Sequence, residues 1–439
     1  MINFFLKIFD FFLSIALFVF SIIFFIILKF YLRKINLISS NIVSLSRDSI
    51  SSTKKLNSRS FLNDFYGHPG FKKTYVISFN DKANKLIILG KNILGVNLSI
   101  NTNFYILNKL KFTNFIIFEI VSILKSIIFM KKTNSGIIEL VTPGPLEFRA
   151  IIIKFVTNCK MMAQVRGNVD LLSHSLDKYF YFRIPRKNLI FKIISLFIHK
   201  LLSELFYTNC DLVIGYNKNN LDSAISNGAD PKISRLLRIE IHKPIYNLST
   251  NQNIKLEGFP SSGRVILIWS RLSQEKLLDE SIKGFILAAD IVDDLSLVII
   301  GSGPYEKKLK NLVNLSNHSE RIHFLGYRDR EYISSAAKKS TLTIISFAGS
   351  SLVEAALLKL PIIAFDIEWH SELIRNNETG YLVDYSNTEH LRDKIIESIN
   401  LPEKLIEMSE NCYVSAMNMF DYNNYLDSKK RYMKILLQK

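Results

Sequence analysis

Cysteine and acidic residues are scarce in this chain of 439 residues. The three cysteines, Cys159, Cys210 and Cys412, form no C-x-x-C pair, which argues against a disulfide framework and a zinc site and fits a reducing compartment. Aspartate and glutamate number 39 against 56 lysines and arginines, so the net charge is +17. This basic surplus predicts an anionic partner: a nucleic acid, an anionic membrane or a phosphorylated substrate.

A long uncharged apolar run lies near the N-terminus. FFLSIALFVFSIIFFIIL, residues 11–28, has 18 residues, which at 1.5 Å per residue span most of a ~30 Å hydrocarbon core. Lys29, Arg33 and Lys34 follow without an A-x-A-like cleavage site, so we favour an uncleaved anchor over a removable signal peptide. The positive-inside rule then predicts a single-pass inner-membrane protein whose other residues are cytoplasmic.

Strand and helix patterns alternate along most of the remaining chain. This rhythm predicts an α/β fold with two Rossmann-like domains, in which ligands bind at the carboxyl ends of parallel strands. In the first domain, TYVISF and KLIILG are read as short buried strands. The predicted parts are a membrane anchor at 1–34, a linker along the membrane surface at 35–60, a first domain at 61–245, a second domain at 255–410 and a closing amphipathic helix at 411–439.

Two further segments of the first domain are strongly apolar with a few basic residues. They are FIIFEIVSILKSIIFMKK, residues 115–132, and KNLIFKIISLFIHKLLSELF, residues 187–206. One interpretation is a pair of basic amphipathic helices that rest on anionic lipid. The other is that both are ordinary core helices of an α/β domain. Neither predicts a second membrane span, because charged residues interrupt both.

The second domain carries two cations directly after its first predicted strand. Arg271 follows RVILIWS, and Lys276 lies at the start of the next helix. Two cations beside a helix N-terminus favour a diphosphate site; the alternative is a solvated loop with two surface bases. After the next strand, Gly301 and Gly303 of GSGP permit a sharp turn or the close approach of a ligand. Tyr327 ends the motif FLGY after a further strand.

Glu354 in SFAGSSLVEAALLKLPIIAFD has two interpretations. Ser351 and Glu354 fit the S-x-x-E capping box, in which the acid binds its own helix start. Alternatively, a carboxylate on the first helical turn accepts hydrogen bonds from a ribose diol, and the amides of Gly349, Ser350 and Ser351 face phosphate oxygens.

Taken in order, these segments resemble a known family. R-L-x-x-E-K, V-I-I-G-S-G-P, F-L-G-Y, G-S-S-L-V-E-A-A and E-L-I-x-x-x-x-T-G-Y-L-V, within about residues 264–385, are similar to the group 1 glycosyltransferases of family 4, which have the GT-B fold. The resemblance implies a retaining, metal-independent transferase without a cofactor, with a nucleotide-diphospho-sugar as donor. It also implies that the first domain binds the acceptor and that the closing helix returns to it.

The resemblance implies a role for each matching residue. Arg271 and Lys276 match the pair that holds the donor diphosphate, and Glu354 matches the acid on the ribose. The remaining matches are Gly349 and Ser350 beside the phosphates or sugar, Tyr327 beside the base, and Arg166 and Gly167 on the acceptor or reacting-sugar side.

The chain also departs from the family pattern. Ser346 stands where the family has a first glutamate that contacts the donor sugar, and the family's glycine-rich loop is not evident, although YGHPGF at 66–71 is a weak candidate. His370, beside Trp369, is read as a packed residue rather than a catalytic one.

The leading hypothesis is a membrane-anchored hexosyl- or related transferase acting on a lipid-linked or membrane-proximal saccharide, in surface polysaccharide or lipopolysaccharide biosynthesis. The alternative is a non-catalytic GT-B subunit of a membrane glycosylation complex, which the missing acid at Ser346 motivates. A nucleic-acid partner is disfavoured, because the chain has no interleaved basic and aromatic motif or reader fold.

Overall fold

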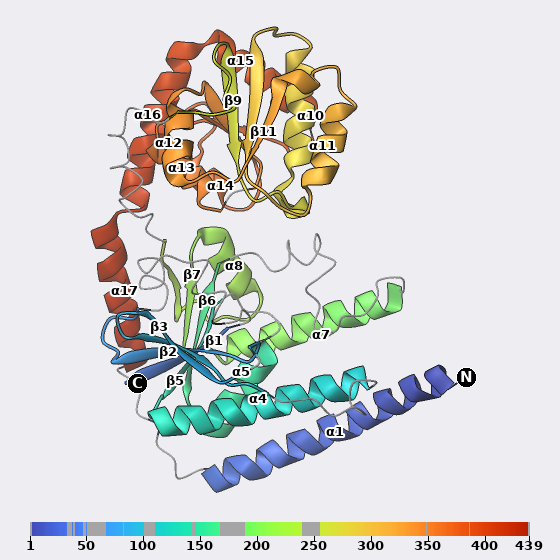
Figure 1. Cartoon of the computed structure of the whole chain (residues 1–439). Coiled ribbons are helices and arrows are strands. Elements are labelled where there is room, and N and C mark those ends of the chain that lie inside the picture. Colours follow the sequence, from blue (N-terminus) through green and yellow to red (C-terminus); the bar gives the residue numbers. More distant parts are fainter. Residues whose placement is uncertain are drawn as a thin grey trace. The chain divides into compact units, whose positions relative to one another are not determined.

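The computed structural model describes residues 2–32, 37, 40–46, 50, 67–81, 83–100, 110–141, 146–166, 189–238, 255–347, 349–385 and 387–437. These residues form two compact units (Figure 1). Unit 1 holds the described residues up to Leu237 and those from Leu426 on, and unit 2 holds those from Arg238 to Tyr425.

Unit 1 is built on an 8-stranded sheet of order β3-β4-β2-β1-β5-β6-β7-β8. All neighbours are parallel except β3 and β4. The strands are β1 (Asn41–Leu45), β2 (Lys73–Ser78), β3 (Lys85–Gly90), β4 (Ile93–Asn97), β5 (Ile137–Val141), β6 (Lys160–Val165), β7 (Leu212–Gly215) and β8 (Ser234–Leu236). The predicted α/β class is confirmed.

Two strands of unit 1 correct the sequence prediction. Strand β1 lies within the predicted linker at 35–60, yet it is central to the sheet, paired with β2 and β5. Its five residues lie between polar serine- and asparagine-rich flanks, which hide the apolar signal. Strand β3, the KLIILG segment, is an edge strand rather than a buried one: Leu86 and Ile88 are each 69% exposed.

Long helices cover the sheet of unit 1 (Figure 1). They are α1 (Ile2–Leu32), α4 (Lys111–Thr133), α5 (Glu147–Thr157), α7 (Leu189–Thr208), α8 (Lys218–Ser226) and the larger part of α17 (Tyr422–Leu437). The closing helix α17 packs on this unit, where Lys160 Nζ donates to the carbonyl oxygen of Leu436. Tyr432 Oη donates to the carbonyl oxygen of Leu236 at 3.1 Å.

Unit 2 is built on a 6-stranded, fully parallel sheet of order β11-β10-β9-β12-β13-β14. Its strands are β9 (Arg264–Trp269), β10 (Leu295–Ile300), β11 (Ile322–Gly326), β12 (Leu342–Ile345), β13 (Ile362–Phe365) and β14 (Tyr381–Val383). Its helices are α10 (Leu278–Ala289), α11 (Glu306–Asn314), α12 (Arg330–Lys338), α13 (Ser351–Leu357), α14 (His370–Leu373), α15 (Thr388–Asn400) and α16 (Pro402–Met419), with the short 3-10 helices η3 (Gln274–Lys276) and η4 (Ser319–Arg321).

Successive side chains of β9 point to opposite faces of this sheet and are buried on both. Ile266 and Ile268 belong to one apolar cluster, whereas Val265, Leu267 and Trp269 belong to another. A parallel strand covered by helices on both sides requires such a continuous apolar run. The carboxyl end of β9 is thereby fixed, and the loop that follows it emerges at a defined edge.

Candidate functional site

The topological switch point of unit 2 lies between β9 and β12. These two strands are neighbours, and the chain leaves them toward opposite halves of the sheet. Ligands of open α/β sheets bind outside the carboxyl ends of the strands at such a point. The residues placed there are the β9–α10 segment, 270–277, and the described part of the β12–α13 loop.

Lys276 and Ser346 link these two segments by two hydrogen bonds, one donated from each segment to the other. Lys276 Nζ donates to the carbonyl oxygen of Phe347 at 3.0 Å, and Ser346 Oγ donates to the carbonyl oxygen of Lys276 at 2.8 Å. Burial lowers the pKa of Lys276, although the charges of Glu275 and Glu368 oppose that shift. The ammonium group is therefore fixed at the switch point, and Ser346 fixes the backbone that carries it.

Arg271 is held by an acid that the sequence reasoning missed. Its guanidinium forms an ion pair with Glu275 while 68% of the side chain stays exposed. Ser273 Oγ donates to the same Glu275 oxygen at 2.6 Å. Burial raises the pKa of Glu275, but a hydrogen bond from Ser273, a backbone hydrogen bond, and the hydrogen bond and charge of Arg271 together lower it by more, so the pKa is below its usual range. Glu275 follows Arg271 by four residues, a spacing that was a usable signal.

Glu354 does not form the capping box, which was one of its two interpretations. Its Oε2 accepts a hydrogen bond from Trp269 Nε1 at 2.9 Å, and Ser350, the N-cap of α13, makes no side-chain cap bond. The carboxylate is thus oriented by the last residue of β9, across the switch point. Trp269 carried no signal in the sequence, because this contact joins residues 85 positions apart.

Gly301 and Gly303 serve a contact between two loops. A Cβ on Gly301 would lie 1.8 Å from the carbonyl oxygen of Ser270, and one on Gly303 would lie 2.2 Å from that of Leu272. Gly301 also has a φ of +141°, which L side chains rarely adopt. The GSGP turn therefore packs its backbone against the segment that carries Arg271. In the structure both glycines permit this loop contact; their donor-binding role stays a prediction.

The other predicted residues of unit 2 lie at the same sheet edge. Tyr327, directly after β11, is 77% exposed. Gly349 and Ser350 are exposed, Ser351 begins α13, and a Cβ on Gly349 would meet nothing within 4 Å. His370 is fully buried, and its Nδ1 lies 2.7 Å from the carbonyl oxygen of Phe365. Burial lowers the pKa of His370 to about 4, so it is a neutral packed residue at pH 7.

Arg166 belongs to unit 1, directly after β6, and Gly167 lies outside the described residues. Arg166 Nη2 donates to Gln164 Oε1 at 2.9 Å, and the guanidinium lies over the ring of Tyr216, 5.1 Å from its centroid. Tyr216 Oη donates to the same oxygen of Gln164. The guanidinium is thus positioned at the carboxyl edge of the sheet by two neighbours that the sequence analysis did not single out.

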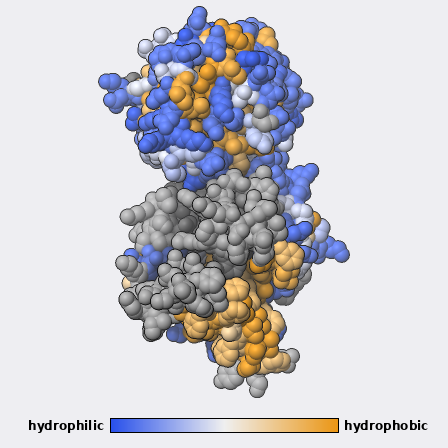
Figure 2. All heavy atoms as spheres, turned by 90° about the vertical axis from the view of Figure 1, so that its right-hand side faces the viewer, coloured by the Kyte–Doolittle hydropathy of each residue, from blue (hydrophilic) through white to orange (hydrophobic). Residues whose placement is uncertain are grey.

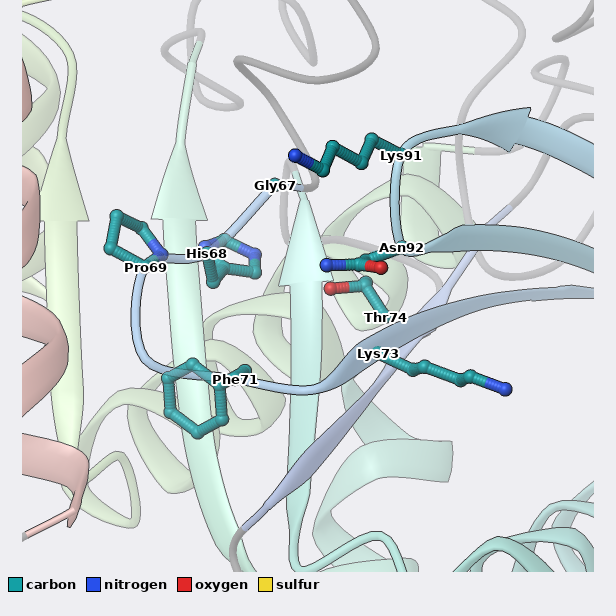
Figure 3. Close-up of a pocket in the computed structure, with 8 residues that line it drawn as sticks. All are labelled: Gly67, His68, Pro69, Phe71, Lys73, Thr74, Lys91 and Asn92. Carbon is teal, nitrogen blue, oxygen red and sulfur yellow. The ribbon is translucent and has the colours of Figure 1, made fainter.

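A buried polar chain continues from Gln164 into unit 1. Gln164 Nε2 donates to Glu139 Oε1, and His68 Nε2 lies 2.9 Å from the same oxygen. Burial raises the pKa of Glu139, but the charge of His68 and the hydrogen bonds from His68, Ser44 and Gln164 together lower it by more, so the net shift is downward. His68 also borders a cavity of about 170 Å³ (Figure 3). This cavity lies at the amino ends of β2 and β4, the sheet edge opposite Arg166, and is lined by Gly67, His68, Pro69, Phe71, Lys73, Thr74, Lys91 and Asn92.

Comparison with known proteins finds a family that resembles part of the chain. The model of the family described as glycosyl transferases group 1 matches residues 249–414. The matched segment, which contains most of unit 2, is similar to the group 1 glycosyltransferases. The match agrees with the family resemblance of the motifs, and the matched segment contains every predicted site residue of unit 2.

Curated relatives match over a limited length. A poly(ribitol-phosphate) alpha-N-acetylglucosaminyltransferase of Staphylococcus aureus is 24% identical over 163 residues, 36% of this chain and 33% of its own length. The GtfA subunit of a UDP-N-acetylglucosamine–peptide N-acetylglucosaminyltransferase of Streptococcus gordonii is 28% identical over 165 residues, 36% of this chain and 32% of its own length. The chain therefore spans about a third of these relatives.

Solved glycosyltransferase structures share the fold over nearly the whole chain. Anabaena HepE, solved in complex with UDP, is 15% identical, with a TM-score of 0.62 and coverage of 91% of this chain and 100% of that one. Sucrose-phosphate synthase of Thermosynechococcus elongatus is 12% identical, with a TM-score of 0.65 and the same coverage. Identities this low show the fold alone, and the predicted GT-B fold is confirmed.

Proposed function

We propose that this protein is a retaining glycosyltransferase that moves a hexosyl or related sugar from a nucleotide-diphosphate donor to a lipid-linked or membrane-proximal saccharide. The observation that carries the proposal is the set of three side-chain hydrogen bonds across the switch point of unit 2. These bonds join Trp269 to Glu354, Lys276 to Phe347 and Ser346 to Lys276. They hold one cation, Lys276, and one carboxylate, Glu354, at the edge where nucleotides bind in such sheets. Arg271, held by Glu275, adds a second cation on the β9–α10 segment.

The charges suit the departure of a nucleoside diphosphate. Cleavage of the anomeric C–O bond leaves negative charge on the leaving diphosphate, and preorganised cations stabilise that charge most strongly in the transition state. Arg271 and Lys276 supply these cations, so the proposed reaction needs no metal ion or other cofactor. An arriving diphosphate favours the charged form of Lys276 and offsets the effect of its burial.

Glu354 is the proposed ribose ligand, and Tyr327 the neighbour of the base. Trp269 binds one carboxylate oxygen of Glu354, which leaves the other for the diol of a ribose. Gly349, Ser350 and Ser351 follow β12 at the same edge and are the proposed phosphate or sugar contacts. On the acceptor side, Arg166 and Gly167 are the proposed contacts from unit 1.

The acceptor is proposed from the relatives and from the N-terminal helix. The S. aureus relative is named for poly(ribitol-phosphate), and a relative in Bacillus subtilis, 26% identical over 174 residues, is named for poly(glycerol-phosphate). Helix α1 contains Phe9–Phe30, whose mean hydropathy of 3.1 suits a membrane. Together these features support a role in surface polysaccharide or lipopolysaccharide biosynthesis, with both globular units on the cytoplasmic side of the inner membrane.

Nucleotide-induced thermal stabilisation of the full chain tests the donor site. UDP, GDP, ADP and CMP are each added to the wild type, Glu354→Ala and Glu306→Ala. A nucleotide present at 100 times its dissociation constant stabilises the fold by about 2.7 kcal/mol. We expect a shift with one nucleotide that Glu354→Ala loses. Glu306→Ala is the matched control, because Glu306 is also a first-turn acid at this sheet edge but pairs with Lys310.

A turnover assay distinguishes an active transferase from the alternative, a non-catalytic subunit, which is suggested by Ser346 in place of the family's first acid. If one nucleotide binds through Glu354 but its sugar conjugates are neither hydrolysed nor transferred, the chain is a nucleotide-binding subunit. If no nucleotide shifts the transition, the donor site itself is refuted. Retention is read from the anomeric configuration of the first product by NMR.

A further inference from the structure

The helices of unit 1 expose a broad apolar face. Figure 2 shows apolar side chains gathered on these helices at the foot of the view. Helix α1 supplies most of them, and α4, α5 and α7 add a few. The exposed members on α1 include Phe9, Phe11, Phe12, Ile15, Val19, Phe20, Ile23, Ile26, Ile27 and Phe30. A face of this kind marks an interaction surface rather than a solvated one.

Helix α1 is docked along the unit over most of its length. The buried Asp10 carboxylate accepts a hydrogen bond from the backbone N–H of Thr113 at 2.9 Å, near the start of α4. Further along, Phe25 is 2% exposed, and Lys29 Nζ lies 3.9 Å from the ring centroid of Phe155 on α5. Figure 1 shows α1 beside α4. One side of α1 is therefore covered by protein, and only the other side is available to a partner.

This packing opposes a crossing of the bilayer by α1 alone. A single spanning helix is surrounded by lipid, so it would have to leave α4 and expose the Asp10 carboxylate that now binds Thr113. Asp10 directly precedes the apolar run at 11–28, so a span would carry this carboxylate to the edge of the hydrocarbon core without its Thr113 partner. Nor does α4 follow α1 across, because Glu119 of α4 forms an ion pair with Arg149 of α5 at 2.8 Å beneath the sheet. Hydropathy alone favours a crossing, and the contacts argue against it.

Basic groups border the apolar face. Lys131 and Lys132, in the last turn of α4, are exposed, and Lys29 lies near the end of α1. A cavity of about 210 Å³ with an almost wholly apolar lining lies where α1, α4 and the end of α5 meet. It is lined by Leu28, Leu37, Leu124, Ile127, Ile128, Lys131 and Thr157. An apolar surface edged by lysine matches a leaflet of anionic phospholipid, whose acyl chains and phosphates meet the two kinds of group.

We propose that α1 lies in the plane of one leaflet, as part of an anionic-lipid platform formed with α4, and does not span the bilayer. The inference rests on the membrane attachment that the proposed function includes, but not on catalysis. Both ends of α1 are then on the same side of the membrane. The platform holds unit 1 directly against the lipid surface rather than at the end of a tether.

Depth measurements on the full chain in phosphatidylcholine–phosphatidylglycerol vesicles test the orientation. Single cysteines replace the exposed Phe12, Val19 or Ile27 and carry a fluorophore; the three native cysteines are buried. Quenching by brominated lipids should place all three labels at the same shallow depth. A crossing would place Val19 about 10 Å deeper than Phe12, since seven residues rise that far. That result, or shielding of one end of α1 from an external aqueous quencher, would overturn the proposal.

Charge substitutions test the lipid partner. Lys131→Gln and Lys132→Gln should each weaken binding to anionic vesicles about fivefold, whereas the exposed Lys283→Gln in unit 2 should leave it unchanged. Two results would overturn the anionic-lipid assignment. One is a vesicle affinity that does not depend on the phosphatidylglycerol content, and the other is a stable dimer that does not bind vesicles. Nucleotide-induced stabilisation is measured on the same samples. If the label depths or the vesicle binding contradict the platform but a nucleotide still raises the melting temperature, only this inference is refuted. If no nucleotide raises the melting temperature but the labels lie at the expected depth, only the proposed donor site is refuted.

Discussion

Replacement of Gly303 by alanine should destabilise unit 2 strongly for a loop substitution. The added Cβ would lie 2.2 Å from the carbonyl oxygen of Leu272, whereas carbon atoms in favourable contact are about 3.5–4.0 Å apart. The two loops must therefore separate by more than about 1 Å. That movement strains the hydrogen bonds from Leu272 N to Ser302 O and from Tyr305 N to Leu272 O, at 3.0 and 2.9 Å.

The magnitude follows from these contacts. Overpacking costs about 1–3 kcal/mol, and each lost hydrogen bond about 1 kcal/mol. We expect a total loss of about 3 kcal/mol, which for a unit of this size lowers the melting temperature by about 6–12 °C. Differential scanning calorimetry of the full chain measures it. Gly349→Ala is the matched control, because a Cβ there meets nothing within 4 Å; it should change stability by less than about 0.5 kcal/mol.

The same variants separate the two roles that a G-x-G turn can have. If Gly303 serves the loop contact, Gly303→Ala loses stability and also weakens nucleotide binding, because Arg271 moves with its segment. If Gly303→Ala keeps the wild-type melting temperature and loses only nucleotide affinity, the glycine faces a ligand and the contact-based reasoning is refuted. Equal losses in Gly303→Ala and Gly349→Ala would also refute it.

Further predictions concern charge and protonation in unit 2. Arg271→Gln and Lys276→Met should each lower kcat about 100-fold or more, which is the effect of losing one transition-state contact of about 3 kcal/mol. Turnover by the wild type should be unchanged in excess EDTA. A requirement for a metal ion would contradict the proposed cation pair. Because burial lowers the pKa of His370 to about 4, the unfolded chain binds a proton first as the pH falls below about 6.5. The free energy of unfolding therefore falls as the pH falls toward 4, and His370 alone lowers it by about 2 kcal/mol between pH 7 and pH 5. Urea unfolding of His370→Asn at several pH values should lack this contribution to the pH dependence of stability. Trp269→Phe keeps the ring in the core but removes the donor to Glu354, so isothermal calorimetry should show weaker nucleotide binding with little change in stability.

Unit 2 was predictable because its strands carry their own signal. Runs such as RVILIW and LSLVII are apolar on both faces, and a polar or glycine turn ends each of them. Unit 1 was less predictable. Strand β1 has only five residues, and its place at the centre of the sheet depends on pairing with β2 and β5. Such non-local pairing leaves no period within a short window.

The candidate site divides in the same way. The motif order placed Arg271, Lys276 and Glu354 at strand ends, and the structure brings them to one sheet edge. Their partners were not predictable: Trp269 and Glu354 are 85 residues apart, and Lys276 and Ser346 are 70 apart. These contacts arise because β9 and β12 are sheet neighbours, which is a property of strand order rather than of local sequence. Glu275 is the exception, since it is local to Arg271.

Ser346 shows how the chain keeps Lys276 in place without the family's first acid. Its hydroxyl donates to the carbonyl oxygen of Lys276, whereas a carboxylate at that position is acceptor-only and would repel the same oxygen. A glutamate there would therefore require a different path for the η3 backbone. In this chain the position tethers the lysine segment, and no carboxylate at residue 346 is available to the donor sugar. Binding of the diphosphate then depends on Arg271 and Lys276 and is separable from sugar recognition. Ser346→Ala should for that reason weaken binding of the nucleotide alone as much as binding of its sugar conjugate, and a loss confined to the conjugate would show that Ser346 contacts the sugar.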